Sequence, residues 1–167
     1  MKTLVITIIG KDRPGIVDQI ASSVRNHQGN WLGCRFANMA GQFAGFVEVD
    51  VEDQQTDALV NSLNLIGDLH VHAVDSEKQK KLDASIVCFS IMGNDKPGIV
   101  NELTSVLQQF SVNIIDFNSE CISAPNWGNL MFQADFKVAV LDNLEIDDIR
   151  EAVEAIANDL VVDIEFD

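Results

Sequence analysis

The feature that most constrains this chain is an eight-residue segment that occurs twice. GKDRPGIV spans residues 10–17 and GNDKPGIV spans residues 93–100, so the copies lie 83 positions apart in a chain of 167 residues. An internal period of about half the length predicts two similar small domains. Domains of about 80 residues bury well under 70% of the surface that the unfolded chain exposes. Neither half is therefore expected to have a generous core.

The same order of strand and helix patterns surrounds each copy. Apolar residues alternate through 3–9 and through the matching segment 85–92, and an amphipathic helix pattern follows each copy. Two strands come next, then a second helix pattern and a last strand at 68–74 or 159–166. This order predicts an α+β fold of two ferredoxin-like βαββαβ domains, each an antiparallel sheet with its helices on one face. We expect the first domain over 1–77, a short charged linker over 78–83 and the second domain over 84–167.

Local signals suggest how the first helix of each half begins and ends. Asp12 and Asp95 stand where a carboxylate can accept from a free N–H of the first helical turn. Gly29 is placed to take a left-handed backbone just after the first helix. Val112 stands at the equivalent position of the second half, so that helix is expected to end differently.

A well-capped turn would explain the repeated segment without any ligand. A functional interpretation also exists, because a helix that begins after a tight glycine turn offers free N–H groups and a positive dipole end to an anion. Ile16-Val17 and Ile99-Val100 stand where a phosphate loop needs Lys followed by Ser or Thr, which argues against a nucleotide. A small carboxylate remains a candidate.

Composition excludes several classes of function. The net charge is −15, with six cationic and ten acidic residues in 1–78 and five against sixteen in 79–167, so direct nucleic-acid binding is not expected. No apolar run approaches the roughly 20 residues of a membrane helix. Three cysteines without a short spacing favour a reducing cytoplasm and no zinc site. We predict no cofactor, no metal site from His70 and His72, and no catalytic motif, so the chain is not expected to be an enzyme.

The order of elements, the Gly-x-Asp-x-Pro-Gly-Ile-Val turn and the asparagines that open the second strands, Asn30 and Asn113, resemble the ACT domain, a module that binds amino acids. Two such modules with nothing else resemble the glycine cleavage system transcriptional repressor family. The resemblance covers essentially the whole chain. It implies two modules side by side, with a ligand between the first turn of one module and the second strand of the other.

The resemblance also nominates ligand-binding residues by position. One set is Asp12, Arg13, Pro14, Gly15 and Ile16 facing Asn113 and Ile114, and the other is Asp95, Lys96, Pro97, Gly98 and Ile99 facing Asn30 and Trp31. Trp31 is bulky where Ile114 stands in the other half, so the two sites need not be equivalent.

These features lead to one main hypothesis and several alternatives. The main hypothesis is a cytoplasmic, non-enzymatic regulator that binds a small amino acid, with glycine implied by the family, and represses transcription by contacting a DNA-binding regulator protein. A protein-interaction module whose turns are only structural, and a detached regulatory subunit of a metabolic enzyme, are the alternatives. The apolar outer sheet face around Val5, Ile9, Cys88 and Met92 is compatible with a homodimer. Trp127 either anchors another protein or packs back on the sheet.

Overall fold

The computed structural model describes residues 1–76, 84–123, 130–141, 144–156 and 159–166. The chain divides into two compact units, Met1–Gln79 and Lys80–Asp167. The expected linker, 78–83, lies wholly within 77–83, which is outside the described residues, and its bounds stay a prediction.

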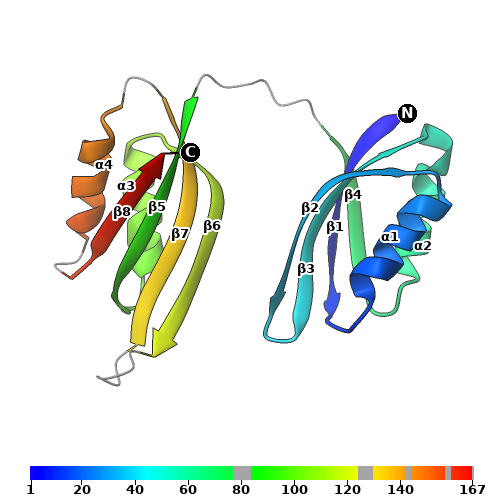
Figure 1. Ribbon diagram of the computed structural model, residues 1–167, viewed down its shortest axis with the longest axis horizontal. Helices are drawn as coiled ribbons and strands as arrows, with labels where there is room; N and C mark the ends of the chain where they lie inside the picture. The colour runs from blue at the N-terminus through cyan, green and yellow to red at the C-terminus, as the bar shows by residue number, and fades with distance from the viewer. Residues whose placement is uncertain (77–83, 124–129, 142–143, 157–158, 167) are drawn as a thin grey trace. The chain divides into compact units, whose positions relative to one another are not determined.

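The first unit is a four-stranded antiparallel sheet in the order β2-β3-β1-β4. Two α-helices cover one face of this sheet (Figure 1). Its elements in chain order are β1 (Lys2–Lys11), α1 (Ile16–Asn26), β2 (Asn30–Met39), β3 (Gln42–Val51), the 3-10 turn η1 (Asp53–Gln55), α2 (Thr56–Asn64) and β4 (His70–Asp75).

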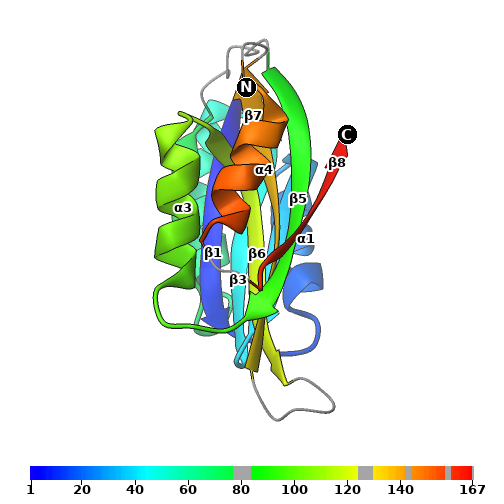
Figure 2. The same ribbon diagram turned by 90° about the vertical axis from the view of Figure 1, so that its left-hand side faces the viewer.

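The second unit repeats this topology, with the sheet order β6-β7-β5-β8. Figure 2 shows α3 and α4 on one side of its strands. Its elements are β5 (Ala84–Asn94), α3 (Ile99–Gln109), β6 (Asn113–Ser123), β7 (Leu130–Leu141), α4 (Ile146–Glu154) and β8 (Val161–Phe166). The predicted fold class, two βαββαβ domains with antiparallel sheets and helices on one face, is confirmed.

Each unit has its own hydrophobic core between sheet and helices. The alternation predicted for β1 places Leu4, Ile6 and Ile8 inside, at no more than 1% exposure, and Ile20 of α1 packs over them. Fully burying one such side chain stabilises the fold by about 1.5–3 kcal/mol. Leu103 takes the place of Ile20 in the second core. The repeat in sequence is therefore also a repeat in packing.

The end of the first helix differs from the expectation. Gln28 takes the left-handed conformation, at φ 57°, and Ser111 does the same after α3 at φ 54°. Both helices thus end in the same way, although the sequence favoured Gly29 and an unlike second end. Gly29 is needed for space instead, because a Cβ there would lie 2.9 Å from Val24 Cγ1 and 3.0 Å from Val49 Cγ1.

Both units carry an irregularity at the same place in the second strand. The register of β2 against β3 shifts between Trp31 and Gly33, and that of β6 against β7 shifts between Ile114 and Asp116. This β-bulge, which the sequence did not predict, re-aims the side chains that follow it. In the described part of the chain no helix is long and apolar enough to cross a membrane.

Candidate functional site

The repeated turn is positioned by close packing at its first glycine. A Cβ on Gly10 would lie 2.7 Å from Leu69 Cδ2 and 2.8 Å from the Asp68 carbonyl oxygen. Gly93 stands against the matching loop of its own unit, at 3.1 Å from Leu160 Cδ2. A Cβ does not fit at Gly10, and at Gly93 it would require the loop to give by a few tenths of an ångström, so glycine allows the close approach of β1 or β5 to the loop before the last strand. The turn therefore leaves the sheet at a fixed place in both units.

The second glycine of the motif lies at the amino end of the helix. Gly15 has φ 82° and Gly98 has φ 88°, both left-handed, and a Cβ added at either would meet nothing within 4 Å. The first helical hydrogen bonds run from the Gln19 and Glu102 N–H groups to the carbonyls of these glycines. No side chain caps either helix start, so first-turn N–H groups are left without a helical partner, although the Ile99 N–H donates to the Lys96 carbonyl at 3.3 Å.

The expected capping role of Asp12 and Asp95 is wrong. The Asp12 carboxylate accepts a hydrogen bond from Asn38 Nδ2 near the end of β2, and its own N–H donates to the Gly41 carbonyl at 3.0 Å. Asp95 is in hydrogen-bond contact with Cys121, the residue 83 positions after Asn38. Partial desolvation by neighbouring atoms first, and then the charge of Asp95, raise the pKa of the Cys121 thiol. Both aspartates thus tie the turn to the second strand.

The cations of the two turns already have partners within their own units. Arg13 donates to Gln19 Oε1 at 2.6 Å, and Lys96 Nζ donates to Glu102 Oε2 at 2.5 Å. Gln19 and Glu102 are again 83 positions apart. Lys96 also donates to the Ile156 carbonyl at 3.1 Å. A ligand carboxylate would have to draw either cation away from these contacts.

The nominated second-strand residues have different surroundings in the two units. Trp31 is half-buried, packs on the first core and meets Phe36 edge to face at 6.1 Å between ring centroids. Asn113 and Ile114 instead line a cavity of about 570 Å³ beside the end of α3. The sequence difference between Trp31 and Ile114 therefore corresponds to a filled surface in one unit and a hollow one in the other.

Within one unit, the turn and the start of the second strand lie at opposite ends of the sheet. In the first unit Asn30 is level with Thr3, because both pair with Asp50, while the turn follows Lys11. Eight residues of strand separate these levels by about 26 Å. One unit alone does not bring its own turn and its own second-strand start together. Ile16 and Ile99 are buried at 4% exposure, so only their backbone can reach a ligand.

The remaining sequence candidates lie apart from the turns. His70 and His72 are exposed on β4, and the described residues contain no group of three or more side chains suited to hold a metal ion. Cys34, Cys88 and Cys121 are free thiols. Trp127 lies outside the described residues. Sequence reasoning missed four partners of the turns, Gln19, Asn38, Glu102 and Cys121, although their shared 83-residue spacing was a usable signal.

Two ACT-domain matches, over residues 2–76 and 85–167, account for both units. The chain therefore belongs to the ACT domain family, and the turn described above is the strand-to-helix turn of each domain. None of the curated proteins compared with the chain is significantly similar to it.

Two solved structures resemble the whole chain. A protein of unknown function from Galdieria sulphuraria is 25% identical, with a TM-score of 0.84 over 99% of this chain and 98% of that one. A protein described provisionally as a glycine cleavage system transcriptional repressor is 20% identical, with a TM-score of 0.69 over the same shares. The second likeness shows the tandem ACT fold alone.

Proposed function

We propose that this protein is a non-enzymatic, cytoplasmic regulator that binds a small amino acid and represses transcription by contacting a DNA-binding protein. The observation that carries the proposal is the pair of open helix starts at Gly15 and Gly98, each left-handed and with nothing within 4 Å of an added Cβ. Membership of the ACT family supports a small-molecule ligand. We expect glycine to be the first ligand to test. The reason is the fold likeness to the protein described provisionally as a glycine cleavage system transcriptional repressor.

The chemistry of the turn suits a zwitterion. The ligand carboxylate would accept from the free N–H groups of the first helical turn, where the helix dipole favours negative charge. Asp12 or Asp95 would accept from the ligand ammonium group. The nominated second-strand residues, Asn113 with Ile114 and Asn30 with Trp31, stay a prediction for further contacts with the ligand.

A melting assay tests amino-acid binding. A ligand present at 100 times its Kd stabilises the fold by about 2.7 kcal/mol, so glycine and other amino acids are added singly and the shift in Tm is measured. The variants Gly15→Asn and Gly98→Asn keep a residue that tolerates the left-handed backbone and place a side chain over the free N–H groups. We expect each variant to lose part of the shift and the double variant to lose all of it.

Gly41→Asn is the matched control. Gly41 is also left-handed, at φ 79°, with nothing within 4 Å of an added Cβ, but it lies in the β2–β3 hairpin. We expect this variant to keep the full shift. No shift with any amino acid would favour an interaction module with purely structural turns, an alternative supported by the engagement of Arg13 and Lys96 within their own units.

The indirect mode of repression is tested with DNA alone. A surface carrying a net charge of −15 repels phosphates, so a labelled promoter duplex should not bind the purified chain at about physiological salt. Binding under these conditions would show that the protein reads DNA itself and would overturn the indirect mechanism.

A further inference from the structure

The two repeated turns carry one central cation each, but the partners of these cations differ in charge. Arg13 donates to Gln19 Oε1 at 2.6 Å, and a glutamine amide is neutral. Lys96 Nζ donates to Glu102 Oε2 at 2.5 Å, and this contact is an ion pair. Gln19 and Glu102 are equivalent residues, because the N–H of each donates to the carbonyl of the left-handed glycine that opens its helix. One sequence difference therefore decides whether the cation of the turn is neutralised.

Arg13 holds its charge without a counter-ion. Within the residues that the structure describes it forms no ion pair, and Asp18 in the first turn of α1 does not contact it. Its guanidinium lies against the backbone of Gly67, where an added Cβ would be 3.3 Å from one terminal nitrogen and 3.6 Å from Nε. A guanidinium has several N–H donors and matches a carboxylate by two parallel hydrogen bonds. The single contact with Gln19 leaves donors for a ligand carboxylate.

Lys96 is engaged more fully. Besides the Glu102 carboxylate, its ammonium group donates to the Ile156 carbonyl at 3.1 Å. The side chains of Lys96 and Glu102 are 37% and 46% exposed, so solvent screens their attraction in part. Partly exposed pairs of this kind are worth a factor of about five at most in an equilibrium constant. A ligand carboxylate at Lys96 has to displace a group of its own chemistry.

The local charge of the two segments differs in the same direction. Residues 10–19 contain two cationic and two acidic side chains, because Lys11 accompanies Arg13. Residues 93–102 contain one cationic and two acidic side chains, because Asn94 stands in place of Lys11 and Glu102 in place of Gln19. An anion therefore meets a balanced segment at the first turn and a negative one at the second.

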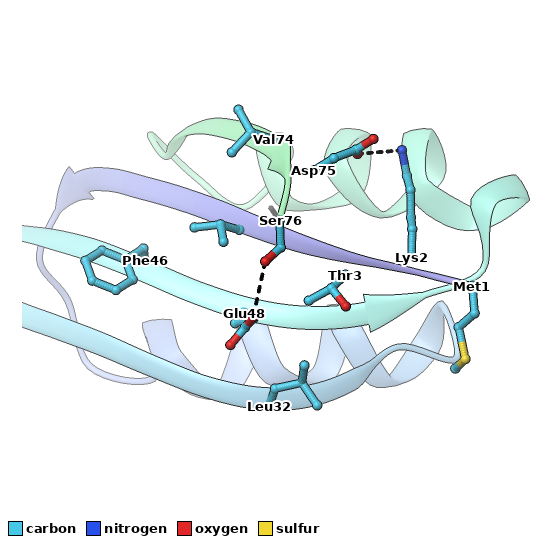
Figure 3. A pocket seen from close by; sticks show the side chains of 10 residues that line it. Met1, Lys2, Thr3, Leu32, Phe46, Glu48, Val74, Asp75 and Ser76 are labelled. Atoms are coloured by element: carbon cyan, nitrogen blue, oxygen red, sulfur yellow. Dashed lines mark hydrogen bonds and ion pairs between the residues drawn. The ribbon is translucent and has the colours of Figure 1, made fainter. Parts of the chain in front are cut away.

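A hollow on the open face of the first sheet provides a contrast within the first unit (Figure 3). Lys2 Nζ lies 2.7 Å from Asp75 Oδ1, and this hydrogen bond is the first cause of the raised pKa of Lys2. The hollow is lined by as many ammonium groups, Lys2 and the Met1 terminus, as carboxylates, Glu48 and Asp75. The charges of this hollow balance, whereas the guanidinium of Arg13 faces a neutral partner.

We propose that Glu102 is an internal competitor for the carboxylate of the amino-acid ligand, so that the first turn binds the ligand more tightly than the second. This inference rests on the proposed function and deepens it, because it ranks the two sites and assigns their difference to Gln19 and Glu102. At Arg13 the ligand carboxylate takes free donors. At Lys96 it first displaces the Glu102 carboxylate. The first turn therefore fills at lower ligand concentration.

Single-site variants of the full chain measure each turn separately. Gly98→Asn blocks the second turn and leaves the first, and Gly15→Asn does the reverse. Glycine and the other standard amino acids are titrated singly into both variants in a calorimeter. We expect a Kd about three- to fivefold lower for Gly98→Asn than for Gly15→Asn. Equal Kd values, or tighter binding by Gly15→Asn, would overturn the proposal.

Exchange of the two equivalent side chains gives the decisive arms. Gln19→Glu is added to the Gly98→Asn chain, and Glu102→Gln is added to the Gly15→Asn chain. Both side chains are exposed, so neither exchange alters a core. We expect the first exchange to raise the Kd about three- to fivefold and the second to lower it by a similar factor. A Kd that neither exchange changes would overturn the proposal.

Two further variants separate competition from general repulsion by a carboxylate. Glu102→Asp keeps the charge but shortens the side chain by one methylene, so competition predicts a Kd closer to that of Glu102→Gln, and repulsion predicts no change. In an Arg13→Gln chain there is no cation to occupy, so Gln19→Glu should have little further effect. An unchanged Kd in Glu102→Asp together with an equal effect of Gln19→Glu with and without Arg13 would assign the difference to repulsion and reject the competitor.

Failure of this inference is distinguishable from failure of the proposed function. Absence of any amino-acid melting shift in the parent chain rejects the sensor, and the ranking of its sites falls with it. A shift in the parent chain with equal affinities at the two turns rejects only the ranking.

Discussion

Glycine serves three different purposes in one short stretch of the first unit. Gly10 allows a close approach to Leu69, Gly15 takes a left-handed backbone in open space, and Gly29 makes room for Val24 and Val49. Only the second of these reasons is about backbone torsion. Substitutions at the three positions should therefore destabilise the first unit for different physical reasons.

Alanine at Gly15 should destabilise the first unit through backbone strain alone. A left-handed backbone costs an L-residue about 1–2 kcal/mol, and a Cβ there meets nothing within 4 Å. Asparagine tolerates this conformation better, so Gly15→Asn should cost less than half as much. Urea unfolding of the two variants and the parent measures the difference. Equal losses would mean that the side chain, rather than the torsion, sets the cost.

Asp159 should make part of the stability of the second unit depend on pH. Its carboxylate accepts from the Asn94 N–H at 2.9 Å and from Asn94 Nδ2 at 2.5 Å, and the backbone hydrogen bond is the first cause of its lowered pKa. Because the folded pKa lies below the unfolded one, this stabilisation is present above about pH 4 and is lost as the pH falls through the folded pKa. Asp159→Asn should be less stable than the parent at pH 7, and the gap should shrink below about pH 4. A gap that stays constant with pH would contradict this assignment.

At the scale of elements, the sequence correctly predicted the strand and helix faces that depend on local periodicity. Alternation along β1 and the helical face that contains Ile20 depend on neighbouring residues, and both were found as predicted. The partner of Asp12 was missed because Asn38 comes from another strand. The left-handed residue after α1 was predicted at Gly29 but lies at Gln28. Glycine is needed at position 29 because of Val49, which comes from β3. Contacts between distant segments thus account for the errors.

The packing of α1 on α2 offers a test of one such contact. Ser23 is 6% exposed, and its Oγ lies 2.7 Å from Ser62 Oγ. Ser23→Ala should cost about 1 kcal/mol, since it leaves Ser62 without its partner. The double variant Ser23→Val with Ser62→Ala copies Val106 and Ala152 of the second unit. We expect it to recover most of the lost free energy of unfolding in urea, and a purely additive loss would argue against a coupled pair.

At the scale of the whole molecule, two separate cores predict that damage to one stays largely in its own unit. Ile20→Ala and Leu103→Ala change equivalent buried positions, and each should cost about 2–5 kcal/mol. Hydrogen exchange should rise mainly in 2–76 for the first variant and mainly in 84–166 for the second. Equal rises throughout the chain in either variant would show that the two cores unfold as one.

The two hydrogen bonds of the Lys96 ammonium group connect separate parts of the second unit. This side chain joins the strand-to-helix turn to Glu102 in α3 and to the carbonyl of Ile156 after α4. One side chain therefore links the turn both to α3 and to the segment that follows α4. A molecule that binds this ammonium group would compete with both contacts at once, so binding at the turn would release α3 and the segment after α4 together.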